Sequence, residues 1–514
     1  MILAALLAAT APLFGAQSGK KTAGTGTAAP QPVEKSRILR EGRLRLQEAV
    51  ELALRRNPQL DLNREKIVEA RSAVAEQEAA FDPTVGATVG ANSSRQASAS
   101  SELDGAARPE SDTANATATI EKPLRDGSTV GLEWDALDRS SSNSSYSSLN
   151  PSYDSALRIT VRKPLLRGAG RENALPGEIA AANLLDTADQ WRAEVETVVE
   201  EVERAYWAIA ATRLALDIRK QGLGVARLIL DETTARQSAR VEVLEAKSNV
   251  VRREAEVATA AKNLKDARDR LFQNIGILGG EEPGELVLDD LLRAEGAVPD
   301  SADCYGEALR QGVDARLEEN RLALARLRIE QARLEMRPTL DLSLTGGLLG
   351  RDGRYGGAVR STMEGDGRYC EAGIELRIPW GLKAEKERLR QADSRLRQEE
   401  QSIDSARLDL FARVREFCRR IDLGLVQLKS AATAVELNQA RFEEQRARRA
   451  NGQAILRDLL EAQAALDEAR LAELQARVEV LDARLGLDAL RGAIPIRHHL
   501  KLELPDTVSP VRRP

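Results

Sequence analysis

The chain is 514 residues long, with 42% hydrophobic and 30% charged residues, a composition typical of folded and not of disordered proteins. A net charge of −5, an isoelectric point near 5.6 and an aromatic content of 3% argue against a nucleic-acid-binding protein, which carries a basic excess and stacks bases on aromatic rings. The three cysteines are scattered and the two histidines are adjacent near the C-terminus, which excludes a disulfide framework, a CxxC metal site and histidine catalysis in the body of the chain.

The N-terminal segment Met1–Ala16 is almost wholly apolar and is followed by polar residues. This length is typical of a signal peptide and too short to cross a bilayer, so we expect residues 1–18 to be a signal peptide and 19–43 a flexible linker. A buried N-terminal helix is the alternative, and the absence of Lys or Arg before the apolar run is a departure from the signal-peptide pattern. No other uninterrupted apolar run reaches about 18 residues, so passage through a membrane would have to use strands.

Sequence markers recur in the same order in the two halves of the chain, which predicts an internal duplication. Ala53–Arg55 recurs as Ala308–Arg310, and Val243–Ala246 pairs with Leu459–Ala462. We expect each half to run helix, strand, loop, strand, very long helix, break and second long helix. The predicted divisions are a first repeat over 44–279, an inter-repeat or equatorial segment over 280–300, a second repeat over 301–492 and a C-terminal tail over 493–514.

Apolar residues of the long helical segments alternate spacings of three and four, the pattern of knobs-into-holes packing. In the first half these positions are Val195, Val199, Val202, Tyr206 and Ile209. In the second half they are Ile455, Leu459, Ala462, Leu466 and Ala469, drifting to Leu471, Leu474, Val478, Leu481 and Leu485. A helix of about 50 residues is roughly 75 Å long, so such helices must pack along one another. A cytoplasmic coiled-coil scaffold is the alternative, and it fits the helices when they are taken alone.

Four shorter segments alternate apolar and polar residues with the period of two that is typical of strands. These segments are residues 85–91, 157–162, 339–345 and 374–378. In water the apolar face of a sheet needs a covering layer, but the neighbouring segments are long helices and Ser-, Asn- or Gly-rich loops over 140–150 and 346–367. An apolar face toward lipid and a polar face toward a lumen explains the pattern better than a scaffold does.

The number of strands predicts an oligomer. Each half offers two clear strands, and Ala116–Glu121 with Thr129–Asp135 would add a hairpin around Asp126-Gly127. Four or six strands are too few to close a membrane barrel, which takes about eight or more, and an open edge in hydrocarbon leaves backbone groups unpaired. Several copies must therefore share one barrel, and the strand count leaves the number of copies open.

With these residues in view, the chain resembles the TolC-type outer-membrane factors, or outer membrane efflux proteins, over Leu44–Gly492. The resemblance rests on Leu46–Val50 followed by Asn57-Pro58, on Leu-Glu-Ala after both helix breaks, and on prolines at the strand junctions. These prolines are Pro83, Pro164, Pro338 and Pro379. The resemblance implies a mainly α protein with membrane β, in which a homotrimer forms a long coiled-coil α-helical barrel and a shared transmembrane β-barrel.

The same resemblance implies a place and partners. The β-barrel would lie in the lipid of the outer membrane and the helices would extend into the periplasm. The partners would be a periplasmic adaptor and an inner-membrane RND or ABC transporter, for which the trimer serves as exit duct. Four strands from each of three subunits would give twelve, so the extra hairpin is a departure from the family pattern.

The family's periplasmic tip, where helices turn back and narrow the pore, resembles Asn451–Ala462. Here Gly452 is followed by a helix with two inward carboxylates, Asp458 and Glu461. Three-residue spacing places both on one helix face, where symmetric copies would form stacked acidic rings that favour cations. A plain solvated helix face is the alternative for these two residues.

In the first half the equivalent carboxylates are Glu242 and Glu245, for which we expect a pore-lining or gate-pairing role. The first tip, residues 236–240, lacks a glycine, and the arginine that helps to lock the closed tip of some members is Ala454 here. We hypothesise that Arg236, Arg240 or Arg457 closes the tip by pairing with Glu242 or Asp458. The residues expected to gate the tip or contact the adaptor are Arg236, Ser238, Arg240, Asn451, Gly452 and Arg457.

Motifs of enzymes and cofactor sites are incomplete. Gly168–Gly170 lacks the third glycine of a dinucleotide loop, and Gly19-Lys20 lacks the rest of a P-loop. His498-His499 has no third ligand in view, so we expect no metal. The sequence therefore predicts no catalytic residue, no cofactor and no nucleic-acid partner. We expect a non-enzymatic channel that passes solutes passively from periplasm to exterior, the alternative being an elongated periplasmic coiled-coil structural or adaptor protein without a pore.

Overall fold

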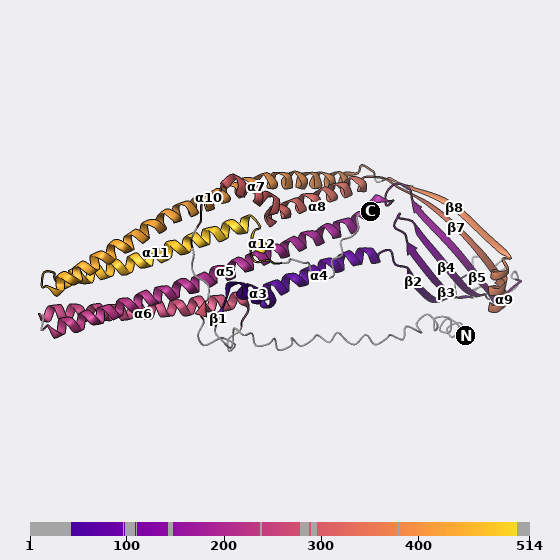
Figure 1. Cartoon of the computed structure of the whole chain (residues 1–514). Helices are drawn as coiled ribbons and strands as arrows, with labels where there is room; N and C mark the ends of the chain where they lie inside the picture. The colour runs from indigo at the N-terminus through magenta and orange to yellow at the C-terminus, as the bar shows by residue number, and fades with distance from the viewer. Residues whose placement is uncertain are drawn as a thin grey trace.

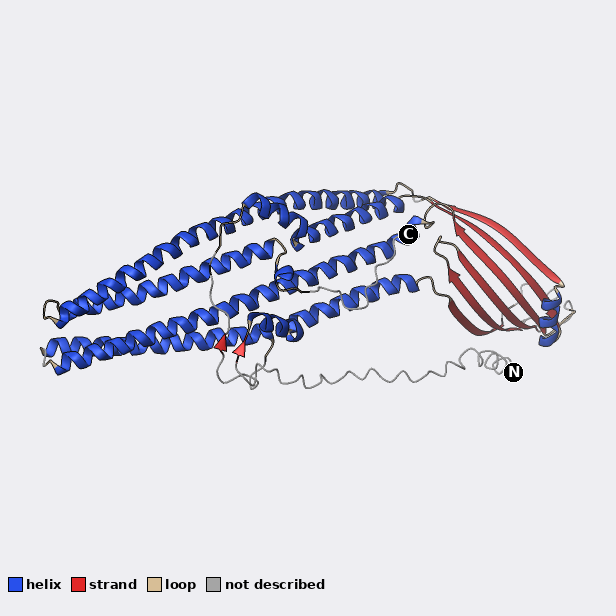
Figure 2. Cartoon of the chain, viewed as in Figure 1, coloured by secondary structure: helices blue, strands red, loops and turns tan. Residues whose placement is uncertain are grey.

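A computed structural model describes residues 43–95, 97, 108, 110–141, 148–236, 239–277, 287–288, 294, 296–378 and 380–500. The expected signal peptide, nearly all of the expected linker and the end of the tail lie outside these residues. The described chain is an elongated rod with the turns of two long helical hairpins at one end and a sheet at the other (Figure 1). Helices and strands are segregated along this axis, with the sheet confined to the end opposite the hairpin turns (Figure 2).

The first half of the chain begins with two helices that are separated by a single residue. Asn57 accepts a hydrogen bond from the Gln59 N–H at 2.8 Å, and Pro58 occupies the first turn, so the second helix is capped where the first one ends. The elements are β1 (Arg43–Leu44), α3 (Leu46–Arg56), α4 (Pro58–Ala79), β2 (Thr84–Arg95), β3 (Glu110–Pro123), β4 (Thr129–Ser141), β5 (Ser152–Pro164), α5 (Arg171–Ala235) and α6 (Arg240–Ile275).

The second half presents a similar order of elements with fewer strands. After β6 (Val287–Leu288), which pairs in parallel with β1, come α7 (Ser301–Gln311), α8 (Val313–Glu335), β7 (Thr339–Asp352), α9 (Tyr355–Glu364), β8 (Gly367–Arg377), α10 (Lys383–Ala450), α11 (Leu456–Leu490) and α12 (Ile494–Arg497). The loop expected over 346–367 is wrong, because β7 continues to Asp352 and α9 follows it. Gly350 allows this, since a Cβ there would lie 2.3 Å from the Ala358 carbonyl oxygen of α9.

The six long strands form one antiparallel sheet in the order β2-β3-β4-β5-β7-β8. The hairpin that the sequence left open is therefore part of the sheet, as β3 and β4. Asp126 shapes its turn by accepting the Ser128 N–H at 2.9 Å. In the described residues β2 and β8 are the two edge strands, each paired on one side only.

The register separates polar from apolar side chains across all six strands. Val85, Ile120, Leu132 and Ile159 are successive cross-strand neighbours on one face, and each is at least 39% exposed. The opposite face carries Thr, Ser and charged residues, including Arg158, which pairs with Glu133 at 2.7 Å and also with Asp135. One side of the sheet is therefore a largely apolar surface, which lies open in the described residues except where α9 packs on β5 and β7.

The heptad positions of the first half are buried as predicted, from Val195 to Ile209. The second half agrees only in part. Leu459, Ala462, Leu466 and Ala469 are buried, but Ile455 is 58% exposed. Along the predicted drift on α11, Leu485 is buried, whereas Leu471, Leu474, Val478 and Leu481 are half-buried. Ala476, Val480, Ala483 and Leu487 are buried as well, and Gly424 of α10 lets the two helices approach closely at Val480, since a Cβ there would lie 2.7 Å from the Val480 side chain. No helix in the described ranges combines the length and apolarity that a bilayer crossing requires.

Candidate functional site

Two helical hairpins, α5–α6 and α10–α11, turn at the same end of the rod, which we name the tip (Figure 1). Gln237 and the expected contact residue Ser238 lie outside the described residues. The second turn is built by Gly452, whose φ of 73° favours glycine. Its N–H donates to the Arg449 carbonyl at 3.1 Å, while the Gln453 N–H donates to the Arg448 carbonyl at 2.8 Å. These bonds satisfy the last carbonyls of α10 and leave Asn451 exposed at the apex.

Asp458 and Glu461 lie one helical turn apart on the exposed face of α11. The structure gives neither carboxylate an ion-pair partner among the described residues. Leu459 and Leu460, between them, are buried in the apolar cluster beneath the tip. Asp458 also occupies the first turn of α11, where a negative charge favours the helix N-terminus. Both carboxylates are thus held on a rigid helix and are free to meet water and ions.

Glu242 lies at the contact between the two hairpins. Its Oε2 atom accepts from Arg449 Nη2 at 2.8 Å, and the same guanidinium donates to the Ala454 carbonyl at 3.3 Å. The Arg449 side chain is 16% exposed, so this pair is largely shielded from solvent. Arg236 donates to the Arg449 carbonyl at 2.9 Å and so adds a second bond between the hairpins.

The other hypothesised gate residues are placed as follows. Arg457 pairs with Glu245 at 3.5 Å and is 68% exposed, and Arg240 is exposed at the start of α6. Asp458 has none of the three hypothesised arginines as an ion-pair partner. The residue that joins Glu242 across the hairpins, Arg449, was not among the hypothesised partners.

Deeper contacts continue the connection between the hairpins. Gln463 of α11 donates to the Gly222 carbonyl of α5 at 2.6 Å. Arg253 of α6 and Asp467 of α11 form an ion pair at 2.8 Å, with side chains 2% and 4% exposed. Gly222 makes room for this pair, because a Cβ there would lie 2.6 Å from Asp467 Oδ2. Burial raises the pKa of Asp467, although Arg253, Arg470 and Arg219 oppose the shift.

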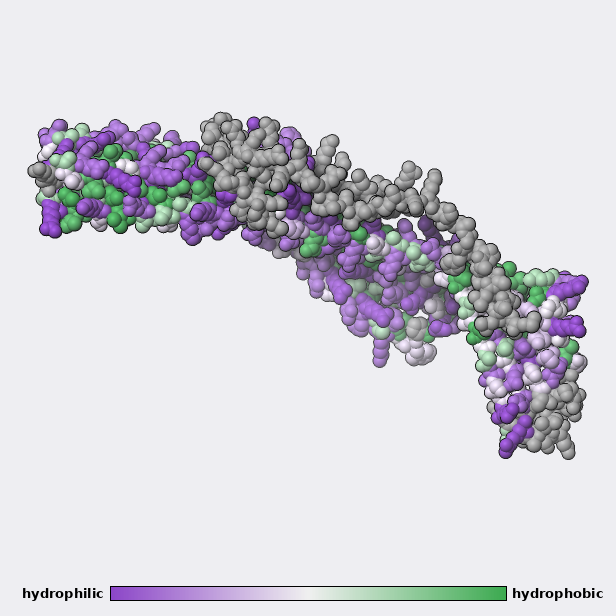
Figure 3. Space-filling model, turned by 90° about the horizontal axis from the view of Figure 1, so that it is seen from below, coloured by the Kyte–Doolittle hydropathy of each residue, from purple (hydrophilic) through white to green (hydrophobic). Residues whose placement is uncertain are grey.

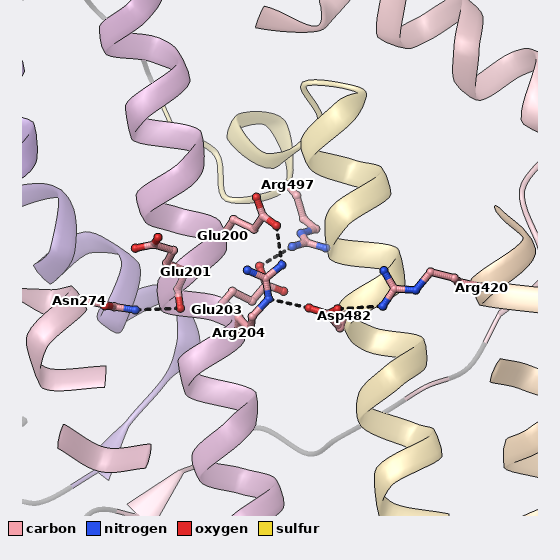
Figure 4. Close-up of polar contacts among 8 residues, drawn as sticks. All are labelled: Glu200, Glu201, Glu203, Arg204, Asn274, Arg420, Asp482 and Arg497. Carbon is pink, nitrogen blue, oxygen red and sulfur yellow. Dashed lines mark hydrogen bonds and ion pairs between the residues drawn. The ribbon is translucent and has the colours of Figure 1, made fainter. Parts of the chain in front are cut away.

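Midway along the rod, where α3 and α12 pack on α5, a network of charged residues connects three of the long helices (Figure 4). We name this region the waist. Arg204 of α5 donates to Glu200 at 2.6 Å and to Asp482 of α11 at 2.6 Å, and Asp482 also accepts from Arg420 of α10 at 3.3 Å.

The C-terminal segment packs on the same region. Arg497 pairs with Glu203, and His498 Nε2 lies 3.1 Å from Glu203 Oε2. Burial alone would raise the pKa of Glu203, but the bonds to His498 and Arg497 hold it below its usual value. The waist therefore joins both halves of the chain by charges that range from the buried Glu203 to the exposed Arg204 and Arg420.

Glu196 gives the waist a pH dependence. Burial, helped by the nearby carboxylate of Asp314 and opposed by Arg316, raises its pKa from 4.5 to about 7. The folded chain therefore favours the protonated carboxyl. The resulting contribution to the free energy of unfolding is fully present below pH 4.5 and is lost as the pH rises through 7. In the wild type the free energy of unfolding should fall by up to about 3 kcal/mol between these pH values, and in Glu196→Gln this fall should be absent. The check is the thermal midpoint of both proteins from pH 4.5 to 8; parallel curves would contradict the expectation.

The described residues contain no group of three or more His, Cys, Asp or Glu side chains that could hold a metal ion. The functional candidates that sequence reasoning missed are Arg449, Gln463 and the Arg253–Asp467 pair. One sequence signal was available for the last two. A glycine inside a long helix, here Gly222, marks a place where another chain segment approaches closely.

With the geometry in place, the chain can be compared with known proteins. Residues 305–493 match the family model for outer membrane efflux proteins. A comparison with curated protein sequences gave no match. Three solved structures share the fold over 87% of this chain: a membrane protein from Pseudomonas aeruginosa, the outer-membrane channel OprN and the Campylobacter jejuni CmeC outer membrane channel.

The structural likeness is extensive and the sequence likeness low. The Pseudomonas protein has a TM-score of 0.64 at 18% identity and is covered over 90% of its length. OprN has a TM-score of 0.66 at 19% identity with 90% covered, and CmeC 0.64 at 14% with 85% covered. At identities this low, the structural similarity shows the fold alone. The match of residues 305–493 adds the sequence pattern of the family.

Proposed function

We propose that this chain is a TolC-type outer membrane efflux protein and forms an export duct, as the family match over residues 305–493 and the fold support. Such a protein lies in the outer membrane and extends into the periplasm. Three copies form one channel, with the sheets joined in the membrane and the hairpins forming a tunnel that narrows at the tip. Solutes pass through it passively, while an inner-membrane transporter and a periplasmic adaptor supply energy and delivery.

One observation carries this proposal: the sheet has a largely apolar face and two unpaired edges in the described residues. A sheet in lipid must close on itself, because hydrocarbon cannot satisfy the N–H and C=O groups of an open edge. Joining β8 of one copy to β2 of the next closes it, with the apolar face toward lipid and the polar face toward the lumen. Each copy then supplies six strands. A barrel of three copies therefore has eighteen strands, which gives a lumen of porin-like width.

The helices support the same assembly. Figure 3 shows apolar side chains gathered along the tip half of the rod, over the α5–α6 hairpin. Val241, Leu244 and Val251 of α6 are 74%, 58% and 66% exposed, at the three- and seven-residue spacings of a helix seam. The second hairpin carries a matching set on α10, comprising Leu408, Leu423, Val426 and Leu437. These surfaces fit neighbouring copies better than water.

The test separates a duct from a pore-free scaffold. We expect the full chain to be recovered from outer-membrane extracts as a trimer in detergent and to give single-channel currents in planar bilayers. Recovery as a water-soluble elongated particle without conductance would favour the coiled-coil scaffold.

The exposed carboxylates of the tip should set ion selectivity. We expect Asp458→Asn combined with Glu461→Gln to reduce the preference for cations several-fold, because the rings lose their charge. The measurement is the reversal potential in a salt gradient. Glu400→Gln with Asp404→Asn is the matched control, since it neutralises two exposed carboxylates of α10 far from the tip. Equal reversal potentials in the tip variant and the wild type would reject the acidic rings.

A further inference from the structure

The fold brings together two cysteines that are far apart in the sequence. Cys304 of α7 is 3% exposed and Cys418 of α10 is 7% exposed, and both belong to one apolar cluster with Val414, Ile421 and Leu487. The thiols are close enough for each to influence the pKa of the other. Cys370, on β8, is exposed and does not belong to the cluster. The two buried thiols therefore share one apolar cluster at the place where α7 packs on α10.

We propose that Cys304 and Cys418 form a disulfide bond in the exported protein. The inference rests on the envelope location given above, because the periplasm is a compartment in which disulfides form and persist. The bond would tie α7 to α10 and close a loop that contains β7, α9 and β8. Long loops of this kind are those in which a crosslink most restricts the unfolded chain.

The chemistry is a thiol–disulfide exchange with a protein disulfide of the thiol-oxidase class as oxidant. One cysteine, as thiolate, attacks a sulfur of the oxidant disulfide and expels one oxidant thiolate. The second cysteine, also as thiolate, then attacks the sulfur of the first cysteine in this mixed disulfide. The Cys304–Cys418 bond forms and the oxidant leaves as its second thiolate. The chain loses two protons and two electrons, and the oxidant disulfide becomes a dithiol.

The structure also indicates when the bond forms. Burial raises the pKa of both thiols, although the nearby Arg491 opposes the shift, so the reactive thiolate is scarce once α7 has packed on α10. Exchange therefore precedes the final packing, while the newly exported chain still exposes both residues. After packing, the same burial protects the bond from reductants.

The experiment uses full-length protein from outer-membrane extracts. The extracts are quenched in acid, and the protein is then denatured and its free thiols are alkylated with N-ethylmaleimide before digestion. We expect mass spectrometry without reductant to find the Cys304 and Cys418 peptides joined, lighter by two hydrogen atoms than the separate peptides, and Cys370 alkylated. Alkylation of all three cysteines would overturn the proposal.

Stability gives a second readout. Reductant should lower the heat-dissociation midpoint of the wild type and of Cys370→Ser, but not that of Cys304→Ala with Cys418→Ala. Equal sensitivity of all three would contradict the disulfide. Conductance of the same preparation keeps the two proposals apart: free thiols in a conducting protein reject only the disulfide, whereas joined peptides in a non-conducting protein reject only the channel.

Discussion

Arg449→Ala is expected to open the tip and to raise the single-channel conductance or the open probability several-fold. The side chain joins α10 to α6 through Glu242 at 2.8 Å and also donates to the Ala454 carbonyl at 3.3 Å. Charge-assisted bonds of this kind contribute about 1.5–3 kcal/mol each when they are partly shielded. Every 1.4 kcal/mol changes an equilibrium about tenfold, so losing the bond in every copy should shift the closed–open balance strongly.

Arg448→Ala is the matched control for this prediction. Arg448 is the preceding residue of the same helix and also an arginine, but its partner is Glu444 of α10 itself, in an exposed i,i+4 pair. Its loss removes the same charge without separating the hairpins. Planar-bilayer recordings should therefore show wild-type conductance for Arg448→Ala and higher conductance for Arg449→Ala. Identical currents from both variants would show that the Glu242 contact does not hold the tip.

The faces of the sheet could be predicted from the sequence because the alternation of strand residues is a local property. Val85 and Ile159 are exposed on the same side in the structure, as their period-two patterns require. The end of β7 could not be predicted from the sequence, because Gly346, Gly347 and Gly350 have low strand propensity. There the packing of α9 on Gly350 overrides local preference.

The tip shows the same limit for ion pairs. The spacing of Asp458 and Glu461 on one helix face is visible in the sequence, because both residues belong to one helix. The partner of Glu242 is not visible in the sequence. The last part of α10 has four arginines, at 441, 446, 448 and 449, and residue type does not distinguish one from another. Only the rotation of α10 about its axis and its crossing of α6 decide that Arg449 faces Glu242.

Asp467→Asn is expected to cause the largest loss of stability of any single tip-hairpin substitution considered. It leaves the buried Arg253 guanidinium with only the longer pair to Glu256, at 3.4 Å, and in the described residues the Nε and Nη2 atoms of Arg253 already lack hydrogen-bond partners. Breaking a buried pair by removing one partner costs about 3–5 kcal/mol. The heat-dissociation midpoint of the purified protein, followed by circular dichroism, should fall accordingly.

Replacing both partners tests whether charge or packing is responsible. Arg253→Met with Asp467→Leu removes both buried charges at similar volume, so it should recover most of the stability that Asp467→Asn loses. Asp266→Asn is the control, because its pair with Lys262 is exposed and an exposed pair contributes about 0–1 kcal/mol. A double variant as unstable as the single one would mean that the hairpins depend on the shape of these side chains beside Gly222. Recovery would mean instead that the ion pair is retained for how the hairpins align, since apolar residues can replace its contribution to stability.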